Sequence, residues 1–132
     1  LKSLARRSHA VTLHAPSIEA TRHMIDREFL ETMRDDAVLV NTARGSLVDE
    51  AALAAVLKNR PRMLACLDVF DPEPPAPDHP LRALPNALLT PHIAGKAGFR
   101  RQMGYAVEEL ERFFNGRRQK YRVTKEKLKR MA

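Results

Sequence analysis

VNTARGSLVDE, residues 40–50, joins an apolar run to a helix-forming segment. The run before it, AVLV at 37–40, is typical of a strand in a parallel sheet whose two faces are covered. The segment after it, at 49–59, starts at a possible N-cap, Asp49, and is rich in alanine and leucine. Arg44 therefore follows the carboxyl end of a strand, where ligands gather in parallel α/β sheets. The alternative is an ordinary surface arginine in a turn.

Strand-like and helix-like segments alternate on both sides of this stretch. Three more short apolar runs predict strands, namely AVTLHAP at 10–16, MLACLDVF at 63–70 and NALLT at 86–90. Asp26 can cap a helix with apolar positions at Phe29, Leu30 and Met33. This order of elements predicts an α/β fold with a mostly parallel sheet.

A long helix and a basic tail complete the chain. Apolar residues recur at helical spacing over roughly 97–115, and we expect this stripe to face the core; its members are Phe99, Met103, Ala106, Val107, Leu110, Phe113 and Phe114. Asn115 and Gly116 are good stop signals. Thr124 can cap a final short helix. The tail then covers residues 117–132.

The net charge of +7 comes mainly from the C-terminal end. Residues 101–132 hold ten Lys or Arg and four Asp or Glu, a net of +6, so the first hundred residues carry only +1. No zinc-finger spacing and no run of stacking aromatics accompanies this charge. We therefore expect no nucleic-acid partner.

Composition favours a cytoplasmic protein without a membrane partner. Cys66 is the only cysteine, so no internal disulfide can form, which fits a reducing compartment. The longest apolar run, AALAAVL at 51–57, is too short to span a bilayer. The chain starts at Leu1 rather than at a methionine, and no signal-peptide pattern follows. The length is that of about one domain, and we expect the chain to be a processed product, a trimmed version or a fragment of a longer protein.

Three polar residues follow three different predicted strands. Arg44 follows the second strand, Glu73 the third and His92 the fourth. Parallel strands end at one edge of a sheet, so we expect the three to meet there. A histidine beside a carboxylate can act as an acid and a base, and an arginine fork binds a carboxylate at two points. A lone histidine after a strand is more often structural, but the shared location predicts a site for a small anionic acid.

The segment between the third and fourth strands is rich in proline. DPEPPAPDHPLRALP, at 71–85, has six prolines among its fifteen residues, too many for a helix or a paired strand. We expect an ordered loop that wraps the surface near the site. A plain connector is the alternative.

Four of these stretches resemble the nucleotide-binding domain of the D-isomer-specific 2-hydroxyacid dehydrogenases. VTLHAP, LVNTARGSLVDEAAL, LDVFDPEP and LLTPHIAG occur in that family's order and spacing. The resemblance implies that residues 1–116 are the C-terminal portion of a dinucleotide-binding domain. Its fold would be a partial Rossmann-like, doubly wound sheet that lacks its first strands and ends in a long helix. Residues 117–132 would return to the substrate domain of a full-length parent.

The resemblance also implies hydride transfer between NAD or NADP and a D-2-hydroxyacid, with no metal. His92 would donate and accept the proton, Glu73 would orient it, and Arg44 would bind the carboxylate and oxo groups of a small 2-hydroxy or 2-oxo acid. Asp68 would contact the nicotinamide carboxamide. The other residues implied to line the cofactor are His14, Ala15, Pro16, Thr42, Ala43 and Gly95.

The chain departs from the family in two respects. His9 stands where members usually have Asp, far from the chemistry. The GxGxxG loop that delivers the pyrophosphate to a helix N-terminus is absent from these residues, as is the acidic residue that reads the ribose. Gly95 and Gly98 keep only the last part of that spacing. We therefore expect these residues alone to be incomplete and inactive.

An open sheet edge follows from the same comparison. In the strand order 3-2-1-4-5-6, AVTLHAP corresponds to the fourth strand and AVLV to the fifth. AVTLHAP should then have a partner on one side only, and an open apolar edge tends to pair with something. We expect a homodimer, or a larger protein, to cover it.

Two other functions compete with the dehydrogenase. The first is a non-catalytic dinucleotide-fold binding module, but such a module does not need Arg44, Glu73 and His92 together. The second is formate oxidation, because PAPDHPLR is similar to a loop of formate dehydrogenases. Those enzymes carry glutamine where this chain has Glu73, and a neutral amide cannot sustain the same pairing with histidine.

Overall fold

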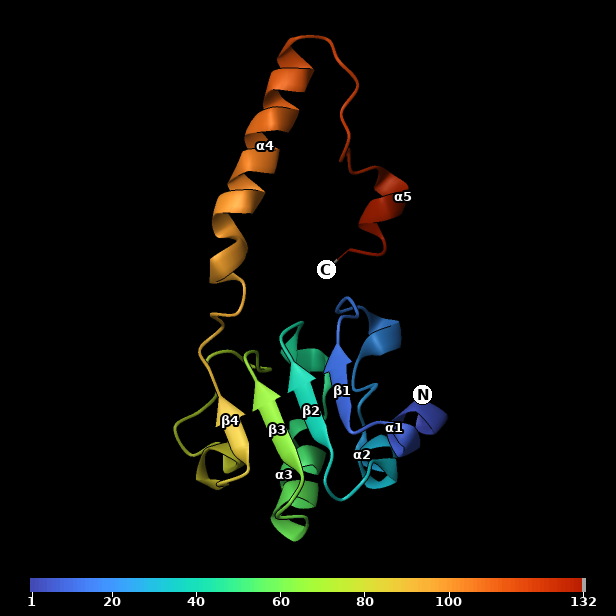
Figure 1. The fold of residues 1–132 in the computed structure, drawn as a ribbon, viewed down its shortest axis with the longest axis vertical. Coiled ribbons are helices and arrows are strands. Elements are labelled where there is room, and N and C mark those ends of the chain that lie inside the picture. Colours follow the sequence, from blue (N-terminus) through green and yellow to red (C-terminus); the bar gives the residue numbers. More distant parts are fainter. Residues whose placement is uncertain (132) are drawn as a thin grey trace. The chain divides into compact units, whose positions relative to one another are not determined.

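The computed structural model describes residues 1–131 and divides into two compact units, Leu1–His92 and Ile93–Ala132 (Figure 1). The first unit contains a four-stranded sheet in the order β1-β2-β3-β4, and all its pairings are parallel. Its strands are β1 (Ala10–Leu13), β2 (Val38–Asn41), β3 (Leu64–Leu67) and β4 (Ala87–Leu89). The predicted α/β class with a mostly parallel sheet is therefore confirmed.

The helices of the first unit are α1 (Lys2–Arg7), α2 (Arg27–Thr32) and α3 (Glu50–Asn59). The two predicted caps are present: the Asp26 carboxylate accepts from the Phe29 N–H at 2.8 Å, and the Asp49 carboxylate accepts from the Ala52 N–H at 2.9 Å. These bonds satisfy amide groups that a helix start leaves unpaired. α1 was not predicted, because its one buried residue, Ala5, gives no periodic apolar pattern.

The core lies on one face of the sheet, the face that α2 and α3 cover. Side chains alternate along each strand, so every second residue points to these helices. The buried positions include Val11, Leu13, Leu39, Ala65 and Leu67 from the strands and Phe29, Leu30, Leu53 and Leu57 from the helices. On the other face, Val38 and Val40 are half-buried and Leu64 is exposed. The continuous apolar run at 37–40 predicted that both faces of the sheet are covered, but the helices of the first unit cover only one face.

The second unit contains the short 3-10 turn η4 (Lys96–Gly98), the long helix α4 (Phe99–Phe114) and α5 (Lys125–Leu128). The predicted bounds of the long helix are correct to within two residues. The Thr124 hydroxyl caps α5, as predicted, by accepting from the Lys127 N–H at 3.3 Å. Among the described residues, no helix has both the length and the apolar character needed to cross a membrane.

The apolar stripe of α4 does not face a core, so that prediction is wrong for this structure. Phe99 is 61% exposed and Phe114 is 80% exposed, and no residue of α4 is buried. A helix buries a stripe only against another apolar layer, and the described residues of the second unit form no sheet that could provide one.

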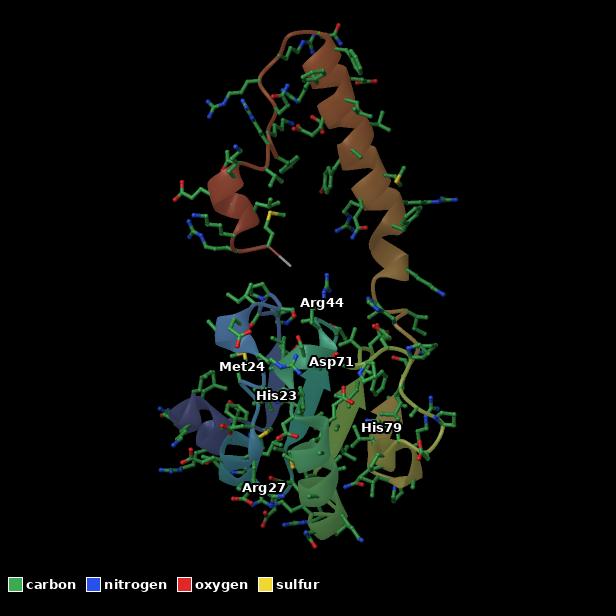
Figure 2. The ribbon with its side chains drawn as sticks, turned by 180° about the vertical axis from the view of Figure 1, so that it is seen from behind. His23, Met24, Arg27, Arg44, Asp71 and His79 are labelled. Carbon is green, nitrogen blue, oxygen red and sulfur yellow. The ribbon has the colours of Figure 1, made fainter. Side chains whose placement is uncertain are left out.

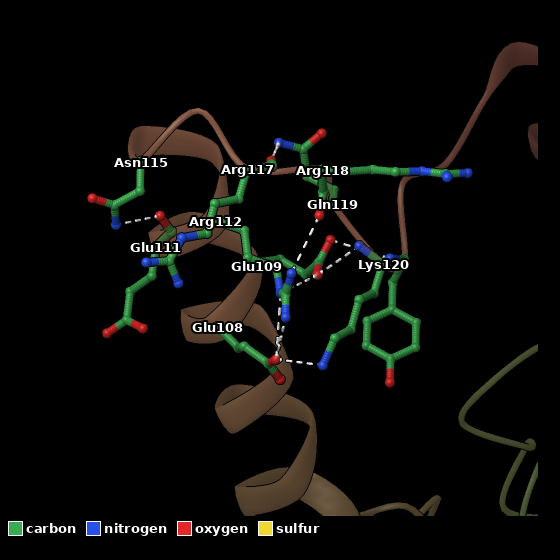
Figure 3. A network of polar contacts seen from close by, with 10 residues as sticks. Glu108, Glu109, Glu111, Arg112, Asn115, Arg117, Arg118, Gln119 and Lys120 are labelled. Carbon is green, nitrogen blue, oxygen red and sulfur yellow. Dashed lines mark hydrogen bonds and ion pairs between the residues drawn. The ribbon is translucent and has the colours of Figure 1, made fainter.

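Polar contacts join the tail to the last turns of α4 (Figure 3). The Glu108 carboxylate accepts from Lys120 Nζ at 2.7 Å and from Arg112 at 3.3 Å. The Glu109 carboxylate accepts from the backbone N–H groups of Lys120 and Tyr121 at 2.9 and 3.1 Å. The hydrogen bond from Lys120, followed by its charge, lowers the pKa of Glu108. The chain after residue 116 therefore runs back along the helix.

Candidate active site

The turn that carries Arg44 is fixed by a buried polar side chain at the end of β2. Asn41 is fully buried; its Nδ2 donates to the Arg44 carbonyl at 2.8 Å, and its Oδ1 accepts from the Ala43 N–H at 3.1 Å. Both bonds go to backbone polar groups of the turn, which need partners near a buried side chain. Sequence reasoning missed this role, although a polar residue that ends an apolar run was a usable signal.

Gly45 brings this turn into direct contact with the chain that leaves β3. A Cβ at Gly45 would lie 2.0 Å from the carbonyl carbon of Phe70. No side chain fits in that space, so the backbones of the Arg44 turn and of the segment that leads to Glu73 touch. The glycine of the ARG motif thus sets the spacing between two parts of the site.

Arg44 and Glu73 line one cavity of about 320 Å³ at the carboxyl edge of the sheet. Its walls are Ser17, Arg22, Arg44, Gly45, Ser46, Val69, Phe70, Asp71 and Glu73. Arg22 forms an ion pair with Asp71 at 3.1 Å, and Arg44 Nη1 donates to the Ala43 carbonyl at 2.6 Å. Figure 2 labels Arg44 and Asp71 at this edge. The cavity is therefore rich in guanidinium and carboxylate groups.

His92 meets Glu73, as the shared strand-end position predicted. The His92 Nδ1 lies 3.1 Å from each carboxylate oxygen of Glu73. The two side chains are 51% and 35% exposed, so solvent and ligands can reach them. With Nδ1–H donated to the carboxylate, the Nε2 atom is the one that can exchange a proton with a ligand.

The backbone of His92 adopts a left-handed conformation, with φ of 50°. Its N–H donates to the Asp68 carbonyl at 2.8 Å, which holds the residue to the end of β3. Non-glycine residues seldom adopt positive φ, and those that do cluster at functional sites. This conformation directs the histidine from the end of β4 toward the loop that carries Glu73.

Asp68 joins the ends of three strands. Its side chain is 3% exposed and accepts a hydrogen bond from the Thr90 hydroxyl, while its N–H donates to the Asn41 carbonyl at 2.9 Å. Asp68 thus lies at the end of β3, between the strands that lead to Arg44 and to His92. Its expected contact with a nicotinamide stays a prediction.

The remaining expected cofactor residues lie mainly past β1 and β2. His14 and Thr42 are exposed, Ala15 and Ala43 pack partly against the core, and the Pro16 carbonyl accepts from the Thr21 hydroxyl at 2.6 Å. Gly95 belongs to the second unit, where it is exposed and precedes η4. Among residues 1–131, no three His, Cys, Asp or Glu side chains are grouped to hold a metal ion.

The parallel sheet with polar residues at its carboxyl edge defines an α/β nucleotide-binding domain. Residues 1–94 match the family described as "D-isomer specific 2-hydroxyacid dehydrogenase, NAD binding domain". The chain belongs to this family of oxidoreductases.

Individual relatives agree with this assignment. The chain is 50% identical over 95 residues to an (S)-sulfolactate dehydrogenase from Chromohalobacter salexigens, covering 72% of this chain and 31% of that protein. It is 40% identical over 119 residues to a glyoxylate reductase from Aeropyrum pernix, covering 89% and 36%. The chain therefore spans about a third of the length of these relatives.

Solved structures show the same fold. The D-lactate dehydrogenase of Lactobacillus jensenii, crystallised with NAD+, matches with a TM-score of 0.81 at 29% identity, covering 94% of this chain and 42% of that one. The TT0316 protein of Thermus thermophilus matches with a TM-score of 0.80 at 43% identity, covering 93% and 40%.

Proposed function

We propose that this chain supplies the acid–base and substrate-binding residues of a D-2-hydroxyacid dehydrogenase. The enzyme transfers hydride between NAD or NADP and a small 2-hydroxy or 2-oxo acid. The observation that carries the proposal is the His92–Glu73 hydrogen bond of 3.1 Å beside a cavity that Arg44 and Glu73 line. A purely binding domain would not require that bond.

His92 passes the proton in this scheme. Its Nδ1–H donates to Glu73, so its Nε2 gives a proton to the 2-oxo oxygen during reduction and takes it back from the hydroxyl during oxidation. The Glu73 carboxylate holds the ring in this orientation and stabilises the imidazolium when it forms. Both roles need the carboxylate rather than an amide.

Arg44 binds the substrate in this scheme. Its guanidinium presents two parallel N–H groups to the substrate carboxylate, which fixes the position of the neighbouring 2-carbon. Asn41 and Gly45 hold the turn in place, so only the side chain has to adjust. Holding the reacting atoms in register is a large part of the rate enhancement.

The residues present fit the nicotinamide end of a dinucleotide. When bound, the cofactor supplies or accepts the hydride. Asp68 and the exposed ends of β1 and β2 at His14 and Thr42 offer polar groups at the carboxyl edge. The chain's five glycines include no GxGxxG turn for the pyrophosphate. Two solved relatives were crystallised with NAD+ and with NADPH, which supports either cofactor.

The proposal extends to organisation and location. Residues 1–116 form the C-terminal portion of the dinucleotide-binding domain, and residues 117–132 return to the substrate domain. The enzyme is a cytoplasmic homodimer. The unpaired side of β1, which pairs only with β2 among the described residues, supports association with a further strand.

The test is steady-state oxidation of NADH and NADPH by the full-length protein that carries this chain, with glyoxylate and hydroxypyruvate as first substrates. His92→Gln should lower kcat by about 10²–10⁴-fold, the usual contribution of a general acid. His9→Gln, a control at an exposed histidine before β1, should leave kcat unchanged. A His92→Gln enzyme with wild-type kcat would refute the proposal.

A further inference from the structure

A second carboxylate–histidine pair lies outside the residues assigned above. Glu50, the first residue of α3, lies with its Oε2 2.9 Å from Nε2 of His79. Its other oxygen, Oε1, accepts from the Asp71 backbone N–H at 3.0 Å. The side chains of Glu50 and His79 are only 10% and 17% exposed. Glu50 therefore uses both oxygens, and both bonds go to the proline-rich loop.

The contacts of His79 fix which of its nitrogens carries the hydrogen. Its Nδ1 accepts from the Leu81 N–H at 3.4 Å, so Nε2 carries the hydrogen and donates it to Glu50. The ring also packs edge-on against Phe70, with centroids 6.1 Å apart. His79 is thus held on three sides, and the bond to Glu50 does not require the histidine to be charged.

The two bonds of Glu50 anchor the proline-rich loop at two points, residues 71 and 79. Glu73 lies between these anchors in the sequence (Figure 2, where Asp71 and His79 are labelled). Burial raises the pKa of the Glu50 carboxyl, and the bonds from Asp71 and His79 act against that shift. A carboxylate placed at a helix start for stability alone could remain in solvent, as Glu28 does in α2.

We infer that Glu50 is a positioning residue for the acid–base pair: together with His79 it holds the loop from which Glu73 reaches His92. This inference rests on the proposed function, because positioning matters for catalysis only if Glu73 and His92 are the reacting pair. The two carboxylate bonds of Glu50 go to Asp71 and His79 rather than to Glu73 or His92, so it acts through the backbone of residues 71–79.

The first test measures the position of Glu73 without turnover. In the 132-residue chain at one fixed pH, the ¹⁵N chemical shift of His92 Nδ1 reports its hydrogen bond to Glu73. Glu50→Gln keeps the size of the side chain but leaves only one acceptor oxygen for two donors. Glu50→Gln should shift the His92 Nδ1 signal from its wild-type position by more than half of the shift that Glu73→Gln causes. An unchanged His92 signal in folded Glu50→Gln would overturn the inference.

Two further variants make this test specific. Glu28→Gln removes an exposed carboxylate from the first turn of α2 and should leave the His92 signal in place. His79→Phe keeps a ring against Phe70 but removes the donor to Glu50, so it should shift the His92 signal in the same direction as Glu50→Gln. This variant decides the question if Glu50→Gln fails to fold, and an unmoved signal in it would count against the inference.

The second test is kinetic and uses the full-length protein. Glu50→Gln should lower kcat about tenfold with little change in the KM for the cofactor, since a misplacement of about 1 Å can cost on the order of a hundredfold. In a Glu73→Gln background, adding Glu50→Gln should lower kcat by less than twofold, because the carboxylate that Glu50 positions is gone. Equal losses in both backgrounds would overturn the inference. Wild-type kcat in Glu73→Gln would instead refute the proposed function, and the NMR result would still decide whether Glu50 positions Glu73.

Discussion

Gly45 and Phe70 are in contact through their backbones, and this contact joins the Arg44 turn to the segment that leads to Glu73. Gly45→Ala would place a methyl group 2.0 Å from the Phe70 carbonyl carbon, so the backbone has to move. We expect a loss of about 2–3 kcal/mol in the free energy of unfolding, typical of overpacking in a rigid setting. Urea denaturation followed by circular dichroism measures it.

The matched control for that substitution is Gly104→Ala in α4. A Cβ there meets no atom within 4 Å, and alanine favours a helix over glycine by about 1 kcal/mol. Helix content should therefore stay the same or rise. A Gly45→Ala chain as stable as the wild type would show that the turn relaxes away from Phe70 at no cost.

Arg44 is the residue whose shape, rather than charge, should matter for activity. In the full-length protein, Arg44→Lys keeps the positive charge but replaces a planar fork with a point charge. We expect kcat/KM for a 2-oxo acid to fall at least about tenfold, the loss of one good charged hydrogen bond of roughly 1.5–3 kcal/mol. Arg62→Lys, at an exposed arginine before β3, is the control. Near-equal kcat/KM in both variants would leave Arg44 as an ordinary surface arginine.

The sequence indicated the meeting of His92 and Glu73 better than it indicated the residues around them. Arg44, Glu73 and His92 follow strand ends, and strand ends can be recognised from apolar runs. Asn41 bonds to the backbone of the turn that follows it, whereas Glu50 bonds to Asp71 and His79 far along the chain. No periodic pattern encodes either kind of bond. Gly45 belongs to a recognisable motif. The need for glycine at this position comes from the close approach of the Phe70 backbone, which depends on the tertiary structure.

At the scale of elements, local sequence signals predicted where helices start, but they did not predict which helix faces are buried. Asp26, Asp49 and Thr124 cap α2, α3 and α5 as predicted, because a cap depends only on the next three residues. The stripe of α4 has helical periodicity, and that much was predicted correctly. Whether a stripe is buried depends on what lies against it, and periodicity carries no information about that.

The contact between α4 and the tail should depend on pH. The folded-state pKa of Glu108 is lowered by the hydrogen bond from Lys120, so the contact is stabilised above the ordinary pKa of glutamate and weakens as pH falls through the lowered value. The rings of Tyr105 and Tyr121, 5.5 Å apart, provide the measurement. Their nuclear Overhauser contact should be strong at about pH 7 and should weaken only at a pH below the usual range of glutamate, about 4.

Two variants separate Glu108 from general acid effects. Glu108→Gln should show the weak ring contact at every pH, because it removes the charge that holds Lys120. Glu126→Gln, which affects only the exposed pair with Arg130, should keep the wild-type pH dependence. If the ring contact in Glu108→Gln is as strong as in the wild type at about pH 7, the charge of Glu108 is not what holds the tail.

At the scale of the whole molecule, the chain carries the residues proposed to react but not the glycine-rich turn of a complete cofactor site. The carboxyl edge of the sheet carries Arg44, Glu73, His92 and Asp68, and the chain covers only about a third of the length of these family relatives. In this fold the pyrophosphate of a dinucleotide binds at a glycine-rich helix start. No such turn is present among these residues.

We therefore expect the 132 residues alone to bind NADH weakly and to reduce no 2-oxo acid at a measurable rate. The unpaired side of β1 should also cause self-association, because an open edge exposes a row of hydrogen-bonding groups. A fluorescence titration with NADH measures the first property, and light scattering measures the second. The full-length protein, titrated in parallel, is the control and should bind in the micromolar range or tighter, which corresponds to about −8 kcal/mol. Tight NADH binding by a monomer of this chain would mean that the strand ends at His14, Thr42 and Asp68 hold the dinucleotide without a glycine-rich turn.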